Sequence, residues 1–173
     1  MGKEKVSNEK KNLHRLAGEF LVASRLTQRG YMTTLQWGTA IGYDILVFDK
    51  KGRVAFLEVK STASNPQRWI LQAKYATPEH DQIPLDHRFV CCVDLSASKT
   101  APTVYVFPAK VVADGLRYFY ARGFSNSEGF MFALDKRPRG RTADPQAETV
   151  GAFIKANEYV DAYDLLGVTP VEK

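Results

Sequence analysis

The sequence predicts an α/β fold in which a mixed central β-sheet is flanked by α-helices, and three observations support this prediction. Short runs rich in valine, isoleucine and phenylalanine alternate with longer segments of helical periodicity. Two of these runs, residues 44–48 and 54–60, are separated by a short polar turn and form one hairpin. With 173 residues, 45% of them hydrophobic, the chain is long enough for a core of its own, so we expect one domain over residues 1–173.

The first element is a helix from about Asn12 to Arg29, and the charged residues 1–10 before it are expected to be frayed and flexible. Gly30 ends the helix, and a first strand follows over residues 32–36. Apolar side chains recur along the helix at intervals of three and four residues, which predicts the stripe that packs on the sheet. This stripe consists of Leu13, Leu16, Ala17, Phe20, Leu21 and Ser24.

The central hairpin fits a three-residue loop, Lys50–Gly52, in which Gly52 takes the left-handed conformation. The register that follows from this loop places Asp44 directly opposite Glu58, on the same face of the sheet. A loop of two or four residues would shift the register by one and place Asp44 opposite Leu57 instead. The expected geometry of these charges therefore depends on the turn.

Downstream of the hairpin, residues 68–74 fit either a strand or a short helix opened by Pro66, because periodicity does not decide between them. Residues 122–150 are punctuated by glycine and proline and are expected to carry little regular structure. Two strands and two helices complete the prediction. They are the strands Arg88–Asp94 and Thr103–Phe107 and the helices from about Pro108 to Ala121 and from about Ala152 to Leu166.

Three charged residues stand where the hairpin strands are expected to meet water. Asp44 opens the first strand, and Glu58 and Lys60 end the second. A strand buried on both faces has no favourable place for a charge, and two facing carboxylates repel each other. A divalent cation between Asp44 and Glu58 removes that repulsion, so the pattern predicts a metal site. The alternative is that Asp44 caps a turn while Glu58 pairs with Lys60 on a solvated strand end.

The pattern Asp44…Glu58-Val59-Lys60 resembles the PD-(D/E)XK nuclease superfamily, which includes restriction endonucleases and archaeal Holliday-junction resolvases. Gly18-Glu19-Phe20 and Gln28-Arg29-Gly30-Tyr31 match the helix that precedes this motif, whereas Tyr43 replaces the motif's proline. The resemblance implies a restriction-endonuclease-like mixed sheet flanked by helices. Later segments resemble a group of uncharacterised bacterial proteins of this superfamily. These segments are residues 69–74, 89–95, 104–113 and 159–166.

The resemblance further implies a metal-dependent endonuclease that hydrolyses DNA phosphodiester bonds. Asp44 and Glu58 would bind Mg²⁺, for which Mn²⁺ can substitute, and the backbone carbonyl of Val59 would add a ligand. Lys60 would lie beside the attacking water or the scissile phosphate. Glu19 would reach the metal or bond to Lys60, and the alternative is a boundary glutamate that faces solvent.

The net charge of +5 and the pI near 9.2 favour a polyanionic partner such as DNA. Two basic clusters are candidates for phosphate contacts, and Gln72 and Lys74 are candidates to approach the site from the next element. For both clusters the alternative is a solvated surface. The clusters are Lys136, Arg137, Arg139 and Arg141 in one loop, and Lys10, Lys11 and Arg15 on the first helix.

Several classes of protein are excluded because their characteristic sequence features are absent. The three histidines have no metal-ligand spacing, and no phosphate-binding loop or dinucleotide fingerprint is present. Cys91 and Cys92 are adjacent in a predicted strand, which indicates two buried, unpaired thiols in a reducing compartment. No apolar stretch reaches about 18 residues, and the N-terminus lacks the apolar core of a signal peptide, so we expect a cytoplasmic protein without a membrane span.

Two other functions stay open on the sequence alone. One is a catalytically silent protein of nuclease fold that binds DNA or a protein partner. The other is a metal-dependent enzyme that acts on a different phosphate ester or small molecule. Many relatives dimerise to cut two strands, so a homodimer is one open arrangement, although no self-complementary patch can be read from the sequence.

Overall fold

The computed structural model describes residues 7–37, 42–63, 67–72, 83–96, 101–120, 129–138 and 144–171. Three α-helices lie within these ranges, α1 (Asn8–Gln28), α2 (Ala109–Tyr120) and α3 (Val150–Phe153). The described strands are β1 (Met32–Leu35), β2 (Ile45–Phe48), β3 (Val54–Thr62), β4 (Arg68–Gln72), β5 (Arg88–Asp94), β6 (Thr103–Pro108) and β7 (Gly129–Ala133).

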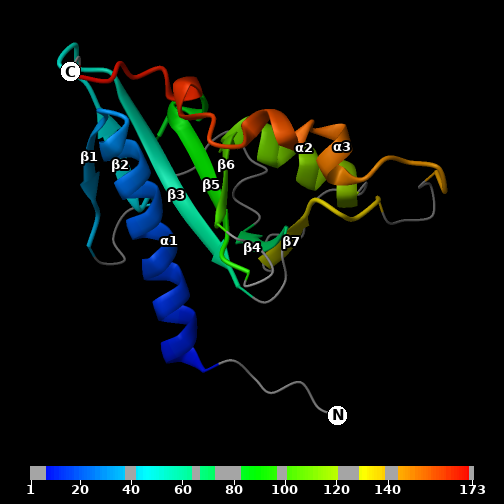
Figure 1. The fold of residues 1–173 in the computed structure, drawn as a ribbon. Helices are drawn as coiled ribbons and strands as arrows, with labels where there is room; N and C mark the ends of the chain where they lie inside the picture. Colours follow the sequence, from blue (N-terminus) through cyan, green and yellow to red (C-terminus); the bar gives the residue numbers. More distant parts are fainter. Residues whose placement is uncertain are drawn as a thin grey trace.

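Five of these strands form one sheet in the order β1-β2-β3-β5-β6, and β4 and β7 form a separate pair. All neighbours in the larger sheet are antiparallel except β3 and β5, which run parallel. Figure 1 shows α1 on one side of this sheet and α2 with α3 on the other. The predicted mixed central sheet flanked by helices is therefore confirmed. Among the described residues, no helix combines the length and apolar character needed to cross a bilayer.

Each face of the sheet builds its own hydrophobic core. On one face, Val22 and Leu26 of α1 pack with Leu57 and Cys91. On the other face, α2, α3 and the β4–β7 pair pack against β5 and β6, and Cys92 belongs to this core. Because successive side chains of a strand alternate, the residues of β3 between those of the first core face the second. Both cysteines are buried and unpaired, as predicted.

Helix α1 approaches β3 most closely at Gly18. A Cβ atom there would lie only 2.2 Å from Oγ of Ser61 and 3.5 Å from a methyl carbon of Val59. The missing side chain therefore lets the helix backbone lie directly on the strand. This contact fixes the position of the next residue, Glu19, beside the last residues of β3.

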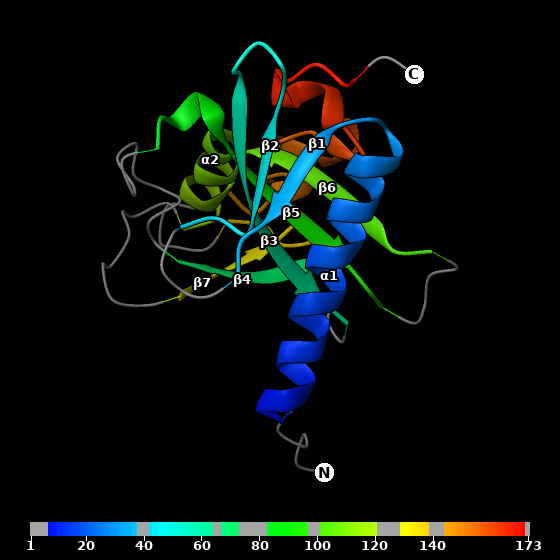
Figure 2. The ribbon, with the colours of Figure 1, turned by 90° about the vertical axis from the view of Figure 1, so that its left-hand side faces the viewer.

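The predicted apolar stripe of α1 is wrong in most of its residues, although Leu21 does pack against the core. The helix buries Gly18, Glu19, Val22 and Leu26, whereas the side chains of Leu13 and Phe20 are 65% and 48% exposed. Two causes explain the difference. The N-terminal half of α1 projects beyond the strands (Figure 2), so its apolar residues meet no sheet. In the other half, the close approach at Gly18 decides which side of the helix is buried.

The hairpin between β2 and β3 has the predicted loop and the predicted register. Gly52 has a φ of +77°, and Phe48 pairs with Val54. Burial alone would raise the pKa of Asp49, which precedes the loop. Hydrogen bonds from the backbone amides of Thr169, Arg53 and Lys51 and from the Arg53 guanidinium outweigh that effect and lower the pKa of Asp49 to about 2. This carboxylate therefore ties the C-terminal segment to the hairpin.

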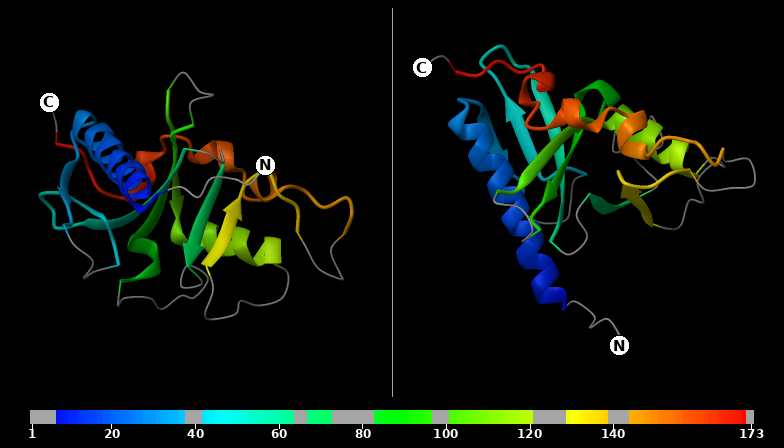
Figure 3. Two further views of the ribbon diagram at one scale, coloured as in Figure 1. Left: turned by 90° about the horizontal axis from the view of Figure 1, so that it is seen from below. Right: turned by 45° about the vertical axis from the view of Figure 1, so that its right-hand side comes forward.

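The open question between strand and helix is answered for residues 68–72 by β4, which pairs antiparallel with β7; residues 73 and 74 lie outside the described residues. Figure 3 shows the two strands side by side on the side of the molecule that carries α2. The sequence reading missed β7 because it lies within the Gly- and Pro-punctuated stretch 122–150. Its Phe132 and the Trp69 of β4 are both nearly inaccessible, so burial against α2 favours a pairing that local propensity does not indicate.

The single helix predicted from Ala152 to Leu166 is also wrong. Helix α3 ends at Phe153, and two 3-10 turns, Ala156–Tyr159 and Tyr163–Leu166, follow it. Asp161 has a φ of +50°; its amide donates to the carbonyl of Val104 at 2.9 Å, and its carboxylate accepts from Arg25 at 2.7 Å. Contacts to β6 and α1 thus replace the hydrogen bonds of a continuous helix.

Candidate active site

Asp44 lies at the bend from which β2 begins. Its amide donates to the carbonyl of Leu57 at 2.8 Å, and its own carbonyl accepts from the amide of Gln36 at 2.8 Å. Its carboxylate Oδ2 accepts a hydrogen bond from the amide of Val59 at 2.7 Å. The pairing of β2 with β3 ends at Leu57. The Asp44 carboxylate therefore accepts the hydrogen bond from the Val59 amide that a backbone carbonyl of a longer β2 would accept. The side chain is thereby held at the edge of β3.

Glu58 and Lys60 follow on β3 and share the face opposite α1. Nζ of Lys60 lies 2.5 Å from Oε1 of Glu58, and the two side chains are 32% and 12% exposed. On the neighbouring strand β5, Glu58 is in register with Val90 and Lys60 with Cys92. The Glu58 side chain is thus largely enclosed, while the Lys60 side chain is partly exposed.

The predicted register brings Asp44 close to Glu58, although the two are not a regular cross-strand pair. The paired residues end at Ile45 and Leu57, and Asp44 stands just outside the ladder. Its carboxylate instead reaches the amide of Val59, which belongs to the same peptide group as the carbonyl of Glu58. The Asp44 carboxylate is therefore hydrogen-bonded to the peptide group that joins Glu58 to Val59. The backbones of Asp44 and Glu58 are not paired in the ladder.

Glu19 reaches the same region from α1. It is only 4% exposed, and Nη1 of Arg15 donates to its Oε1 at 2.6 Å. Burial raises the pKa of Glu19, and the negative charge of Asp44 raises it further, against lowering effects from Arg15 and Lys60. The charges of Asp44 and Lys60 thus both act on the Glu19 carboxyl. Of the four side chains predicted as catalytic, Glu58 and Lys60 form an ion pair on β3, Asp44 is bonded to the β3 backbone at Val59, and Glu19 lies on the facing helix α1.

The donor set can be tested against the requirements of Mg²⁺. Among the described residues, no three acidic, histidine or cysteine side chains form a ready-made metal cage. Mg²⁺ keeps several waters and is commonly held by one or two carboxylates together with substrate phosphates, so a full cage is not required. Asp44 and Glu58 supply two carboxylates, and the repulsion between Glu19 and Asp44 is the kind that a cation relieves. The residues present fit a Mg²⁺ ion.

A hollow of about 250 Å³ opens beside Lys60, between the end of β3 and the β4–β7 pair. Arg68 lines it and forms two hydrogen bonds to Asp135, at 3.2 and 2.5 Å. Ile70, two residues further along β4, is 67% exposed on the same outer face. Sequence reasoning missed Arg68 because its segment was undecided between helix and strand.

The other residues predicted to bind nucleic acid are placed only in part. Lys136 and Arg137 lie after β7, where the carbonyl of Lys136 accepts from Val150 at 2.7 Å and Arg137 donates to the carbonyl of Pro145 at 3.0 Å. These contacts lead to α3 and involve none of the four residues around β3. Gln72 ends β4, but its side chain is outside what the structure describes, and so are Lys74, Arg139 and Arg141.

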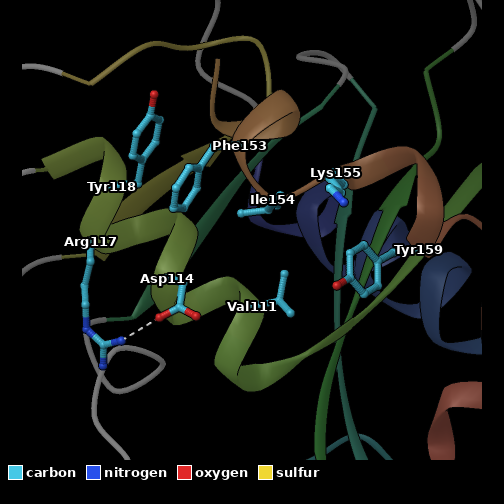
Figure 4. Close-up of a pocket in the computed structure, with 8 residues that line it drawn as sticks. All are labelled: Val111, Asp114, Arg117, Tyr118, Phe153, Ile154, Lys155 and Tyr159. Atoms are coloured by element: carbon cyan, nitrogen blue, oxygen red, sulfur yellow. Dashed lines mark hydrogen bonds and ion pairs between the residues drawn. The ribbon is translucent and has the colours of Figure 1, made fainter. Parts of the chain in front are cut away.

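A larger hollow of about 460 Å³ lies between α2 and the segment that begins with α3 (Figure 4). The rings of Tyr118 and Phe153 stack in its wall with centroids 3.9 Å apart. Arg117 pairs with Asp114 at its rim, at 2.9 Å. None of the four residues around β3 lines it, and it has no pair of neighbouring carboxylates. The candidate chemistry therefore belongs to the end of β3.

Comparison with solved structures identifies structural neighbours, and two of them are nucleases. No family model matches the chain, and no curated protein matches it by sequence. The bacterial homing endonuclease I-Ssp6803I is 16% identical with a TM-score of 0.46, and the match covers 94% of each chain. Hjc, a Holliday junction resolvase of Archaeoglobus fulgidus, is 12% identical with a TM-score of 0.41, and the match covers 82% of this chain and 95% of Hjc. Both neighbours have the restriction-endonuclease-like fold of PD-(D/E)XK nucleases, and the likeness concerns the fold alone.

Proposed function

We propose that the protein is a metal-dependent endonuclease that hydrolyses phosphodiester bonds in DNA. The observation that carries this proposal is that the Asp44 carboxylate binds the β3 backbone at Val59, between Glu58 and its ion-pair partner Lys60, while the buried Glu19 of α1 responds to the charges of Asp44 and Lys60. Partly and fully buried charges cost folding free energy unless they are compensated. Several of them in one place therefore indicate a functional site more readily than a structural one.

Asp44 and Glu58 would hold Mg²⁺, or Mn²⁺ in its place, with the carbonyl of Val59 as a further oxygen ligand. Such an ion lowers the pKa of a bound water and stabilises negative charge on phosphoryl oxygens. The hydrogen bond from the Val59 amide fixes the orientation of the Asp44 carboxylate before any ligand arrives. Preorganisation of this kind avoids the reorganisation that would otherwise oppose the reaction.

Lys60 is the group placed to contact the scissile phosphate. The Lys60 side chain is partly exposed and its ammonium group lies next to Glu58, so it can donate a hydrogen bond to a phosphate oxygen. A fixed ammonium group there offsets the negative charge that develops on the phosphorus-bound oxygens as the water attacks in line. Glu19 is a positioning residue, since its charge acts on both Asp44 and Lys60.

The proposal is tested by cleavage of labelled single-stranded, duplex, flap and four-way-junction DNA in Mg²⁺ and in Mn²⁺. Wild type is compared with Asp44→Ala, Glu58→Ala and Lys60→Ala, and with Lys50→Ala on the exposed hairpin loop as a control. We expect cleavage by wild type and the control and none by the three site variants. Full activity in a site variant removes that residue from the mechanism, and failure of wild type to cut any substrate contradicts the proposal.

A second function is favoured by one specific contact. The 2.5 Å ion pair between Lys60 and Glu58 neutralises Glu58 without any metal, which suits a DNA-binding protein that keeps the nuclease fold but does not turn over. Calorimetric titration with Mn²⁺ separates the two functions, because the nuclease binds the ion and its Glu58→Ala variant does not. A protein that shifts DNA on a gel but takes up no Mn²⁺ is the binding protein.

A further inference from the structure

Two large aromatic side chains are exposed together on the surface near the candidate site. Phe20 of α1 is 48% exposed, and Trp37, which follows β1, is 69% exposed. Their rings are in contact, with centroids 6.1 Å apart and planes inclined by 57°. A paired, solvent-facing phenylalanine and tryptophan form an apolar patch of a kind that marks interaction sites.

The aromatic pair is connected to the candidate site through the backbone at both rings. Phe20 directly follows Glu19, which is coupled electrostatically to Asp44 and Lys60. Trp37 directly follows Gln36, whose amide donates to the carbonyl of Asp44 at 2.8 Å. Each ring thus belongs to a residue whose neighbour in the chain contacts Asp44 or responds to its charge.

The charge of α1, the helix that carries Phe20, favours a polyanion that carries flat apolar groups. The exposed N-terminal half of α1 presents Lys10, Lys11 and Arg15, which outnumber its one exposed acid, Glu9. Arg15 is 52% exposed even though it is paired with Glu19. Aromatic rings with neighbouring cations are the usual means of binding single-stranded nucleic acid, where bases stack on the rings and cations follow the phosphates.

We propose that Phe20 and Trp37 form a stacking platform for an unpaired nucleobase of the substrate, next to the scissile phosphate. This inference rests on the proposed nuclease function and narrows its substrate class. The faces of paired bases inside a duplex are covered by their neighbours, so the platform selects single strands, flaps or branch points. Phe20 and Trp37 are thus specificity residues, whereas Asp44, Glu58 and Lys60 perform the chemistry.

The intrinsic fluorescence of Trp37 can be used to detect a base that stacks on this platform. The chain contains two tryptophans; Trp69 is 2% exposed and donates its indole N–H to the carbonyl of Val93. Because Trp69 also lines the hollow beside Lys60, a change of fluorescence on adding DNA is assigned to Trp37 only where it is absent from the Trp37→Phe variant. The titration uses a single-stranded oligonucleotide of about 12 nucleotides, the abasic strand of the same length, and the blunt duplex, all in EDTA. The platform predicts strong quenching by the strand with bases and little by the other two.

Variants extend the test to affinity, measured by fluorescence anisotropy of a labelled single strand. We expect binding about 10-fold weaker for Trp37→Ala and Phe20→Ala, with recovery in Trp37→Phe, since stacking tolerates any aromatic ring. Phe153→Ala is the matched control, because Phe153 is 46% exposed but lies beside α2. Circular dichroism checks that each variant is folded.

Three results would overturn the platform: equal quenching by the abasic strand, unchanged affinity in Trp37→Ala, or a dimer in sedimentation that Trp37→Ala dissociates without changing DNA affinity. The last result assigns the patch to a second copy of the chain. Because the titration needs no turnover, the two proposals fail separately. Cleavage in Mg²⁺ without quenching removes the platform alone, and quenching without cleavage of any DNA removes the nuclease.

Discussion

At the scale of single residues, the Asp44 carboxylate has two distinct tasks. Its Oδ2 satisfies the amide of Val59 at 2.7 Å, which is a contribution to folding. Its negative charge raises the pKa of Glu19, which is a property of the site. A substitution that keeps the acceptor oxygen but removes the charge separates the two.

The first prediction uses this separation. Asp44→Asn retains an oxygen that accepts from the Val59 amide, so we expect near wild-type stability but cleavage at least about 100-fold slower. Asp44→Ala leaves the amide without its acceptor and costs a further 1–3 kcal/mol or so of unfolding free energy. Urea unfolding and cleavage rates measure the two effects. Wild-type cleavage by Asp44→Asn would show that the charge is not needed.

The second prediction concerns the pH dependence of stability through Glu19, whose pKa in the folded state is raised from 4.5 by burial and by Asp44. A carboxyl with a raised folded pKa binds its proton more tightly in the folded state. Its contribution to stability is therefore present below the unfolded pKa and is lost as the pH rises through the folded pKa. Without metal, Glu19→Gln should flatten this decline and raise the melting temperature at neutral pH.

Thermal unfolding in EDTA, repeated at several pH values from about 4 to 7, checks this expectation. Glu9→Gln is the matched control, because Glu9 lies on the same helix and is exposed. A lower melting temperature for Glu19→Gln at neutral pH would mean that the ion pair with Arg15 outweighs burial and the repulsion from Asp44.

At the scale of elements, the position of α1 decides whether Glu19 reaches the site. The helix rests on β3 at Gly18, where a Cβ would meet Oγ of Ser61 at 2.2 Å. Glycine inside a helix normally weakens it relative to alanine. Its presence here is explained by the close approach, which a larger residue would prevent.

The third prediction follows from that contact. Gly18→Ala should destabilise the protein by about 1–3 kcal/mol through overpacking, although alanine is the better helix former. It should also slow cleavage, because α1 moves away from β3 and takes Glu19 with it. Urea unfolding of Gly18→Ala and of Gly18→Ala/Ser61→Gly measures the effect, and the second change should restore part of the loss. A more stable Gly18→Ala would contradict the close approach.

The elements also show which parts of the structure a sequence can predict. The hairpin register followed correctly from a local feature, the three-residue loop with Gly52. The buried side of α1 could not be predicted from local sequence, because it depends on a contact with Ser61, which is distant in the sequence. Strand β7 and the break after α3 were missed for the same reason, since pairing with β4 and contacts with β6 are tertiary.

In the candidate site, too, some residues could be predicted from the sequence and others depend on tertiary contacts. Asp44, Glu58, Lys60 and Glu19 could be predicted because charges stand out in apolar strands and helices, and in the structure Lys60 pairs with Glu58 while Asp44 accepts from the amide of Val59 between them. Arg68 and the hollow beside Lys60 were not found, because they require the β4–β7 pair to be placed against β3. Sequence patterns thus identify the charged groups, and the tertiary arrangement identifies the surface around them.

At the scale of the whole molecule, charge is distributed in a way that suits a nucleic acid. The chain carries a net charge of +5, and α1 projects beyond the sheet with Lys10 and Lys11 near its free end (Figure 2). Phosphate contacts by such groups release counterions, so binding should weaken as salt concentration rises.

The fourth prediction is a salt dependence that α1 controls. On single-stranded DNA, the plot of log affinity against log salt should have a negative slope, and Lys10→Ala/Lys11→Ala should make it shallower by about 1 to 1.5. The control Lys50→Ala/Lys51→Ala removes the same charge from the exposed hairpin loop and should leave the slope unchanged. Fluorescence anisotropy at several salt concentrations measures both. Equal slopes for the two double variants would exclude α1 from the DNA contact.

The central claim is that Asp44, Glu58 and Lys60 form a metal-dependent site that cuts DNA, and one comparison tests it most directly. Wild type and Glu58→Gln are assayed side by side in Mg²⁺ on the DNA that wild type prefers, after equal binding in EDTA has been established. The account predicts cutting by wild type and a rate at least about 100-fold lower for Glu58→Gln. Equal rates for the two proteins, or no cutting by wild type on any DNA, would contradict it.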